Sequence, residues 1–521
     1  MQPLVEVGNL KCWCYATDNP DSFWGPPTLL FNSPEYFFAF LPVAALVYFL
    51  LQRFSGAKAA KVWLVAASLY FYAYWNVAYL PLIIVSILVN YTVANLLHRA
   101  KSRQSAAVIS AKSILIMGII FNLGLLAYFK YTDFFIENVN VVLGSQFDLL
   151  HVLLPLAISF FTFQQIAYLV DGYKFDIHEY DFLSYCLFVC FFPQLIAGPI
   201  VHHKEMMPQF LDRNNTSPHA ENIARGVLLF GIGLFKKVVI ADTFAMWADP
   251  GFSAVQDPSF LEAWQTSLCY TFQLYYDFSG YTDMALGAAL LFNIRLPLNF
   301  NSPYKALDIQ DFWRRWHMTL SRWLKDYLYI PLGGNRHGSL RTYFNLFATF
   351  LLGGLWHGAG WTFILWGSLH GFALILHRLW SNSGRRIDNA FAWLITFLFV
   401  NFAWVIFRAE DMQGAGRLIA GMLGLNGFGL DQNLQDNIGY FAGLLRLQGP
   451  VDVDNLMGPV GAALFIAIFG LIAFLGKNSM EIAADKTRFN MLDILTVAAA
   501  IFLTLLLGIA SSSSVFLYFN F

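Results

Sequence analysis

Two histidines lie where the surrounding sequence makes an ionisable side chain costly, and both could carry a proton in a reaction. His357 interrupts a long apolar stretch within NLFATFLLGGLWHGAGWTFILWGSLHG, residues 345–371. His317 lies in FWRRWHMTLSRWLKDYLYIP, residues 312–331, among three arginines, one lysine and three tryptophans. Ionisable groups at membrane depth are functional candidates, and an imidazole is a suitable general base near neutral pH. His357 is therefore the first candidate for proton transfer and His317 the second, while His370 is weaker.

Four glycines surround His357, at positions 353, 354, 358 and 360. Glycine allows close backbone approach and unusual dihedral angles. These glycines fit either a narrow channel beside His357 or tight packing between two helices.

The stretch 312–328 predicts one cationic amphipathic helix when its residues are placed about 100° apart. The apolar half carries Phe312, Trp313, Trp316, Leu320, Trp323, Leu324, Tyr327 and Leu328. The polar half carries Arg314, Arg315, Ser321, Arg322, Lys325 and Asp326. Such a helix suits the cytoplasmic membrane interface, with Asp311 paired to Arg314 or Arg315 and Arg322 paired to Asp326. His317 falls on the apolar half, as either a site residue or a core histidine bonded to a carbonyl.

The composition is that of a protein that crosses the membrane several times. Of 521 residues, 57% are hydrophobic and only 12% are charged. A spanning helix needs about 20 apolar residues, and the runs available predict about eleven spans, give or take two. The runs are 35–52, 62–78, 79–97, 113–129, 151–170, 182–200, 223–245, 264–292, 344–356, 361–379, 390–407, 458–475 and 491–509.

These runs predict an all-α polytopic membrane protein with a single membrane domain over residues 31–521. Residues 1–30 read as an atypical N-terminal extension, and a misassigned start codon would explain it. Five scattered cysteines indicate no disulfide framework, and no zinc-binding or P-loop pattern is present. Nothing in the sequence calls for a metal or for nucleic acid. The basic stretches 53–61, 98–112 and 301–345 predict the cytoplasmic side.

Further polar residues interrupt the apolar runs. The segment YYDFSGYTD places Asp277, Ser279, Tyr281 and Asp283 in a predicted span, where they could line the tunnel of a site or hold helices together. Lys236 and Lys237 read as interfacial anchors at the end of a span. His202 and His203 read as loop residues, with contact to the acceptor substrate as the alternative.

Seven motifs, in this order, resemble the membrane-bound O-acyltransferase superfamily, and specifically its bacterial alginate O-acetyltransferase branch. The resemblance runs from about residue 30 to the C-terminal FLYFNF, with a motif core at 270–380. The motifs are FNSPEYFFAFLP (31–42), PLAISFFTFQQIAYLVD (155–171), FFPQLIAGPIV (191–201), GLFKKVVIAD (233–242), YYDFSGYTDMALG (275–287), DFWRRWHMTLSRWLKDYLYIPLGGNR (311–336) and LLGGLWHGAGWTFILWGSLHG (351–371).

The resemblance implies spanning helices with re-entrant and interfacial helices around a central tunnel in the bacterial inner membrane. An acyl donor enters from the cytoplasm and a hydroxyl acceptor from the other face. His357 in LWHG matches the family's general base, and His317 in RRWH matches its second histidine. Arg314, Arg315, Arg322 and Lys325 would attract a phosphate-bearing donor such as acetyl-CoA, although lipid headgroup contact explains any one of them as well. Trp356 would line the tunnel.

The resulting expectation is O-acetylation of an exported polysaccharide, alginate-type first, with no bound cofactor and acetyl-CoA as a substrate. A periplasmic acetyl-handling protein is an expected partner, besides the lipid bilayer. The alternatives keep the fold: peptidoglycan O-acetylation, or D-alanyl transfer toward teichoic acid from a carrier protein. A polysaccharide transporter without acyl-transfer chemistry is the remote alternative.

Overall fold

The computed structural model describes residues 29–102, 109–175, 181–429, 432–445 and 457–485, together with 501, 504, 516 and 517. Every regular element in these ranges is helical, as predicted. Residues 1–28 of the predicted extension and most of the last apolar run, 491–509, lie outside the described residues. The principal helices are α1 (Leu41–Phe54), α2 (Ala57–Trp75), α3 (Leu80–Ser102), α4 (Ala111–Leu143), α5 (Ile158–Lys174), α6 (Phe182–Cys190), α7 (Phe192–Leu195), α8 (His203–Met206), α9 (Ala220–Phe235), α10 (Asp242–Ser253), α11 (Phe260–Leu290), α12 (Ile309–Arg315), α13 (Met318–Leu324), α14 (Gly338–His357), α15 (Trp361–Asn382), α16 (Asn389–Arg408), α17 (Met412–Met422), α18 (Gln432–Leu445), α20 (Pro459–Leu475) and α21 (Ser479–Asp485).

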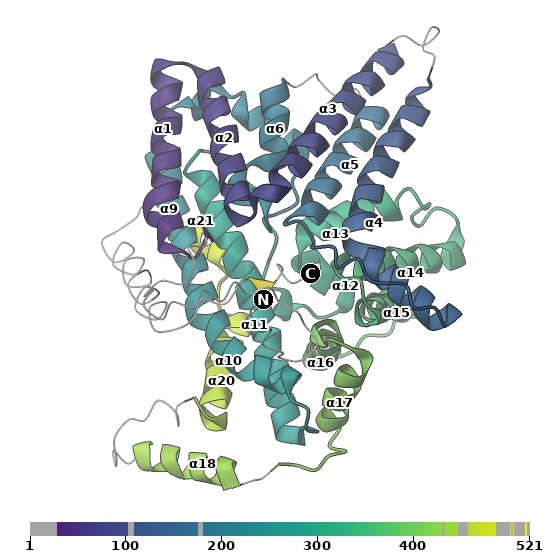
Figure 1. Ribbon diagram of the computed structural model, residues 1–521. Coiled ribbons are helices and arrows are strands. Elements are labelled where there is room, and N and C mark those ends of the chain that lie inside the picture. Colours follow the sequence, from purple (N-terminus) through teal and green to yellow (C-terminus); the bar gives the residue numbers. More distant parts are fainter. Residues whose placement is uncertain are drawn as a thin grey trace, which may run out of the picture.

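Helix α11 forms the centre of the molecule, with the other helices arranged around it (Figure 1). It begins at a capping box, in which Ser259 and Glu262 bond each other's main-chain N–H groups. From residue 269 to residue 289 every side chain is buried. Helix α9 lies against it at close range, because a Cβ atom on Gly233 would come within 2.5 Å of the Gly280 carbonyl oxygen. Glycines at helix crossings allow this approach in membrane proteins.

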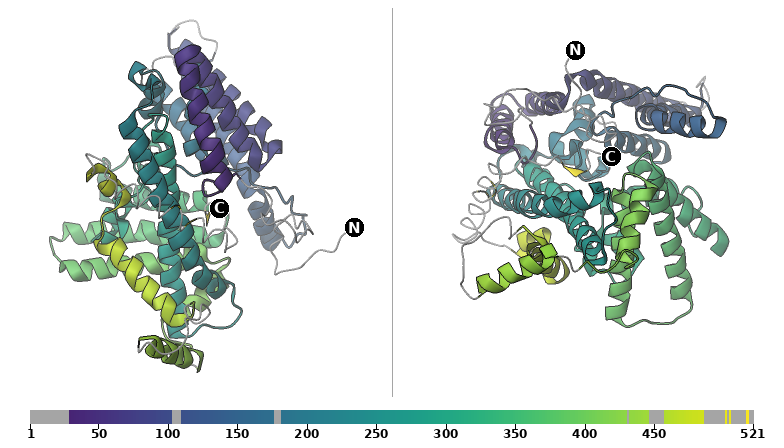
Figure 2. Two further views of the ribbon diagram at one scale, coloured as in Figure 1. Left: turned by 90° about the vertical axis from the view of Figure 1, so that its left-hand side faces the viewer. Right: turned by 60° about the horizontal axis from the view of Figure 1, so that its bottom comes forward.

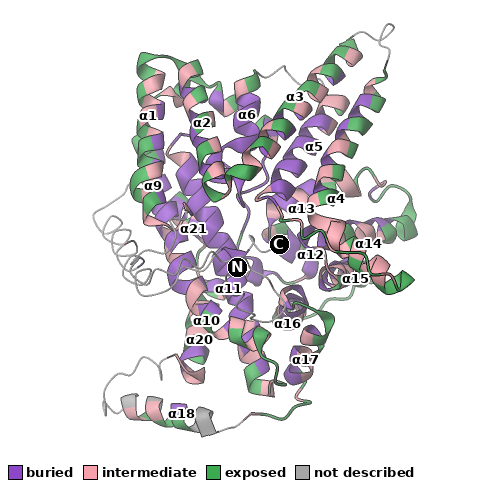
Figure 3. Cartoon of the chain, in the orientation of Figure 1, coloured by how far each residue is buried: buried purple, intermediate pink, exposed green. Residues whose placement is uncertain are grey.

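The first helices of the chain present a different surface. Figure 3 shows exposed residues along the outer faces of α1, α3 and α4, whereas the centre around α11 is buried. Four helical segments in the described part are long and apolar enough to cross a membrane: Glu35–Phe54, Val77–Ser102, Ala111–Leu143 and Asn389–Arg408. The exposed apolar faces fit contact with lipid. The number of about eleven membrane spans stays a prediction.

The C-terminal ends of α1 and α3, where the first two basic stretches begin, lie at the same end of the molecule in Figure 1. That these stretches face the cytoplasm stays a prediction. Lys61, near the start of α2, is mostly buried there, and its ammonium lies 3.0 Å from a carboxylate oxygen of Asp181.

Helices α14 and α15 form an antiparallel pair that lies steeply inclined to α11 (Figure 2). Their backbones nearly touch: a Cβ atom on Gly354 would lie 2.9 Å from the Cα atom of Gly367. At Gly358 a Cβ atom would collide with the ring of Phe363. Of the two explanations for the glycines around His357, tight helix packing is the one seen at positions 354 and 358.

The segment 312–328 is not one continuous helix, so that prediction is wrong. Helix α12 ends at Arg315, Trp316 is extended, and His317 adopts a left-handed conformation with φ 42°. Helix α13 then begins at Met318. The predicted burial pattern holds nonetheless: Trp316, Leu320 and Trp323 are buried, while Arg314 and Lys325 are exposed.

Candidate active site

The Asn299 side chain holds His317 at the break between α12 and α13. The Asn299 Oδ1 atom lies 3.0 Å from His317 Nδ1, and it also accepts hydrogen bonds from the Thr319 hydroxyl and main-chain N–H. The Asn299 main-chain carbonyl accepts from the N–H of Met318 at 3.0 Å. Asn299 thus satisfies groups that a continuous helix would bond internally, which explains why the helix breaks here.

His357 is the last residue of α14 and is 4% exposed, while His317 is fully buried. The Trp356 ring bridges the two, with its centroid 4.9 Å from the His357 ring and 6.4 Å from the His317 ring. Aromatic rings of Trp366 and Phe407 pack edge-on against His357. The structure therefore brings His317, Trp356 and His357, from two separate segments, into one buried cluster.

His370 belongs to a neighbouring aromatic core. The Trp313 indole N–H donates to His370 Nδ1 at 3.2 Å, and the Trp366 ring lies 4.7 Å from the imidazole. Because this pair anchors α12 to α15, a packing role accounts for His370. That assignment agrees with its lower rank as a candidate.

The two carboxylates of the YYDFSGYTD segment are both in ion pairs. Asp277 lies 2.9 Å from the Lys237 ammonium, and Asp283 lies 2.7 Å from the Lys236 ammonium. Lys237 is only 3% exposed, so the interpretation of these lysines as interfacial anchors is wrong. Buried charges require partners, and the two pairs join the segment after α9 to α11. Asp277 and Asp283 thus hold helices together.

The other two candidate residues of that segment, Ser279 and Tyr281, have different surroundings. Ser279 lines a small cavity that it shares with Asn299 and Asp283. The Tyr281 ring stacks between Phe31 and Phe516, with centroid distances of 4.7 and 4.4 Å. Ser279 and Asp283 therefore line the same cavity as Asn299, the residue that is bonded to His317.

The four cations that were expected to attract the acyl donor fall into two groups of two, one with carboxylate partners and one without. Arg315 is bonded to Asp311 at 2.9 Å, as one of the two predicted pairings. Arg322 is bonded to both carboxylate oxygens of Glu205, so its predicted pairing with Asp326 is wrong. Arg314 and Lys325 are exposed, and neither has a carboxylate partner among the residues that the structure describes.

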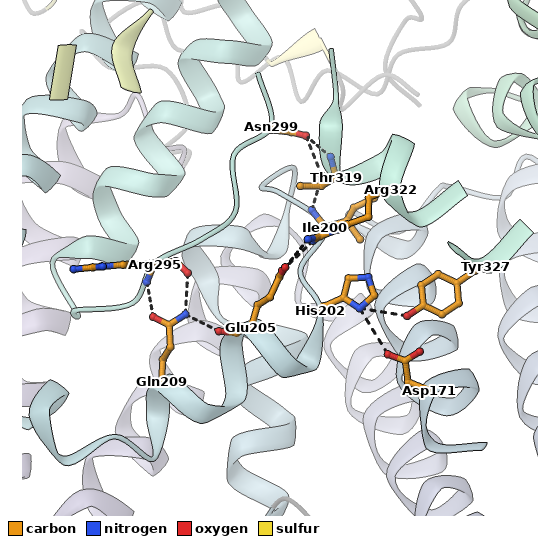
Figure 4. A network of polar contacts seen from close by, with 10 residues as sticks. All are labelled: Asp171, Ile200, His202, Glu205, Gln209, Arg295, Asn299, Thr319, Arg322 and Tyr327. Carbon is orange, nitrogen blue, oxygen red and sulfur yellow. Dashed lines mark hydrogen bonds and ion pairs between the residues drawn. The ribbon is translucent and has the colours of Figure 1, made fainter. Parts of the chain in front are cut away.

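Figure 4 shows how the segment after α7 is attached to α13. The N–H of Ile200 donates to the Thr319 hydroxyl at 3.0 Å, and that hydroxyl donates to Asn299. The Tyr327 hydroxyl lies 3.3 Å from His202 Nδ1 in the same network. His203 is 1% exposed and bonded to Asp171 at 3.1 Å, so its description as a loop residue is wrong.

Three residues of the site were missed in the sequence. Asn299 gives no signal of its own, because its role depends on a fold that brings it to His317. Lys130 donates to the main-chain carbonyls of Trp356 and His357, and the Tyr131 hydroxyl donates to that of Leu355. Lys130 does carry a signal, since it is an ammonium directly after the apolar run 113–129.

These features define a class: helical membrane proteins with a buried histidine pair at the centre of the fold. The family model of the membrane-bound O-acyltransferases (MBOAT) matches residues 172–410, which include both histidines. The chain belongs to the membrane-bound O-acyltransferase family and is an O-acyltransferase, as the motifs predicted.

Relatives of three kinds are similar to this chain. It is 51% identical to the peptidoglycan O-acetyltransferase of Helicobacter pylori, covering 95% of this chain and 98% of the relative. It is 41% identical to the probable alginate O-acetylase of Pseudomonas aeruginosa, covering 88% of this chain and 86% of the relative. It is 27% identical to the teichoic acid D-alanyltransferase of Streptococcus thermophilus, over 45% of this chain and 59% of the relative.

Proposed function

We propose that this protein transfers acetyl groups across the bacterial inner membrane for the O-acetylation of peptidoglycan. The observation that carries the proposal is the 51% identity, over nearly the whole of both chains, to a peptidoglycan O-acetyltransferase. The alginate O-acetylases are 40 to 42% identical over less of the chain, so alginate, the first expectation, becomes the second candidate. D-Alanyl transfer is third, because that similarity covers about half of the chain.

The chemistry proposed for the buried histidine cluster is an acyl transfer from a thioester to a hydroxyl. His357 removes the proton from the acceptor hydroxyl while its oxygen attacks the thioester carbonyl. The carbon–sulfur bond then breaks, and the leaving thiolate takes up a proton. Proton transfer by a positioned histidine contributes about 10²–10⁴-fold to rate. A buried, mostly aromatic setting supports this role, because it keeps competing water away from the thioester.

His317 is proposed to act on the donor side of the same cluster. Arg314 in α12 and Lys325, directly after α13, are exposed cations that suit the phosphates of acetyl-CoA approaching from the cytoplasm. His317 itself is buried beneath that face and adjoins Trp356. The product acetyl group would pass on the other face either to the polymer or to a periplasmic acetyl-handling protein.

The test is the content of ester-linked acetate in the cell envelope of a strain that lacks this gene. The strain is complemented with the wild-type chain or with His357→Ala at matched membrane abundance. We expect the wild-type chain to restore acetate on purified peptidoglycan and His357→Ala to restore less than about 1% of it. Trp380→Phe, at a partly exposed position far along α15, is the control and should behave as wild type.

Each other outcome has a distinct meaning. Acetate restored on a secreted polysaccharide instead of peptidoglycan would favour the alginate-type function. Restored D-alanyl esters would favour the carrier-protein alternative. Full activity of His357→Ala, with altered polymer export, would contradict acyl transfer at His357 and support a transporter.

A further inference from the structure

Lys130 is the one ammonium in the interior of α4, a 33-residue helix apolar enough to cross the membrane. A lysine in such a helix normally pairs with a carboxylate or reaches toward the interface. Among the described residues no carboxylate lies within ion-pair distance of Lys130. Its ammonium instead donates to the main-chain carbonyls of Trp356 at 2.6 Å and His357 at 2.9 Å.

These carbonyls belong to the end of α14, where a helix has no hydrogen-bond donors of its own. The last four carbonyls of a helix lack intrahelical partners, and an unbonded carbonyl is costly away from water. At the end of α16 the next main-chain N–H, that of Ala409, donates back into the helix. At the end of α14 the extended conformation of Gly358, φ −160° and ψ 152°, turns the chain away. Side chains of α4 replace the missing donors.

Two consecutive residues of α4 share this task. The Tyr131 hydroxyl donates to the Leu355 carbonyl at 2.8 Å, next to the two carbonyls bonded by Lys130. The ammonium also complements the negative end of the helix dipole. The Lys130 ammonium lies 5.8 Å from the Trp356 ring centroid, so it adjoins the ring that bridges the two histidines.

We infer that Lys130 is a positioning residue for acyl transfer, which fixes the main chain at His357 and thereby aims the imidazole at the acceptor hydroxyl. The inference rests on the proposed role of His357. Only one methylene group joins the imidazole to the main chain, so a shift of the main chain also shifts the imidazole. Small misplacements of a catalytic group reduce the reaction rate strongly. Lys130 contacts the peptide carbonyls and therefore acts through His357.

The test compares Lys130→Met, Lys130→Arg and Tyr131→Phe in the complemented deletion strain, with the initial rate of envelope acetate formation per folded enzyme as the readout. We expect Lys130→Met to lower that rate at least about 10-fold. Lys130→Arg restores the cation and the donors and should recover the rate to within about threefold. Tyr131→Phe, which removes one of the three bonds, should lower it about two- to fivefold. Lys112→Met is the control, because Lys112 is exposed near the start of the same helix.

A purely structural role would lower the amount of folded enzyme in the membrane and leave the rate per folded enzyme unchanged. A wild-type rate for Lys130→Met would overturn the inference. If Lys130→Met does not accumulate, Lys130→Gln and Tyr131→Phe decide, and wild-type rates for both would overturn it. His357→Ala in the same strain separates the two proposals. If His357→Ala is fully active, the proposed role of His357 as the base is wrong. If His357→Ala is inactive while Lys130→Met is fully active, only the proposed role of Lys130 is wrong.

Discussion

The two histidines of the cluster are fixed in contrasting ways. His317 is held by Asn299, only 18 residues earlier in the chain, through a bond to the imidazole itself. The main chain at His357 is held by Lys130, 227 residues earlier, through a bond to its carbonyl. Asn299 orients the His317 ring, whereas Lys130 fixes the end of α14. The difference teaches that the two histidines are positioned independently, so each should be separable from the other by mutation.

After the loss of His357, the next largest effect is expected for the loss of His317. Its left-handed conformation favours asparagine over most residues, so His317→Asn removes the imidazole while keeping the break between α12 and α13. We expect acetyl transfer to fall by about 10- to 100-fold, at the lower end of the range for a general acid or base. The measurement is turnover of the purified enzyme with acetyl-CoA.

His317→Ala provides the comparison, because it loses the imidazole and also strains the main chain. It should be no more active than His317→Asn and less stable to heat. Wild-type turnover for His317→Asn would show that only the conformation at this position matters, and it would leave His357 as the single histidine of the reaction.

A smaller effect is expected at Asn299. Asn299→Leu keeps the volume but removes the oxygen that serves His317 and both donors of Thr319. Lost acceptors in a buried site cost about 1–3 kcal/mol, and a reoriented His317 should lower turnover about 10-fold. Turnover and the midpoint of thermal unfolding would both be measured.

Asn345→Leu is the matched control for Asn299→Leu. Asn345 is fully buried and donates to the Gly334 carbonyl at 2.8 Å, at a site away from both histidines. It should lower the unfolding midpoint and leave turnover per folded enzyme unchanged. Equal losses of turnover in the two variants would mean that Asn299 acts only through stability.

The same contrast explains what could be predicted from the sequence. Helical periodicity predicted the burial of Trp316 and Trp323, which the structure confirms, and an ionisable group in an apolar run made His357 a candidate. The break at His317 could not be predicted, because its cause, Asn299, lies outside the segment 312–328 and reaches His317 only in the folded chain. Lys236 and Lys237 were misassigned for a related reason: a lysine at the end of a span has the same local sequence whether it faces headgroups or a buried aspartate.

The smallest effect on acetyl transfer is expected when the exposed cations near His317 are neutralised. Arg314 and Lys325 have no carboxylate partner in the described part of the chain, whereas Arg315 and Arg322 are paired. The double variant Arg314→Gln, Lys325→Gln should raise the KM for acetyl-CoA about three- to tenfold with little change in kcat, because it weakens attraction of the phosphates. The measurement is KM in proteoliposomes at low salt.

A control variant tests whether the position of the lost cations, rather than their number, changes the KM. Arg336→Gln with Arg341→Gln makes the same charge change at two other exposed sites and should leave KM within about twofold. Raising the salt concentration should reduce the difference between the two double variants, since exposed charges are screened. Equal KM values at low salt would assign Arg314 and Lys325 to lipid headgroups. The approach of the donor would then depend on the buried side of α12 and α13, beside His317, and not on their exposed face.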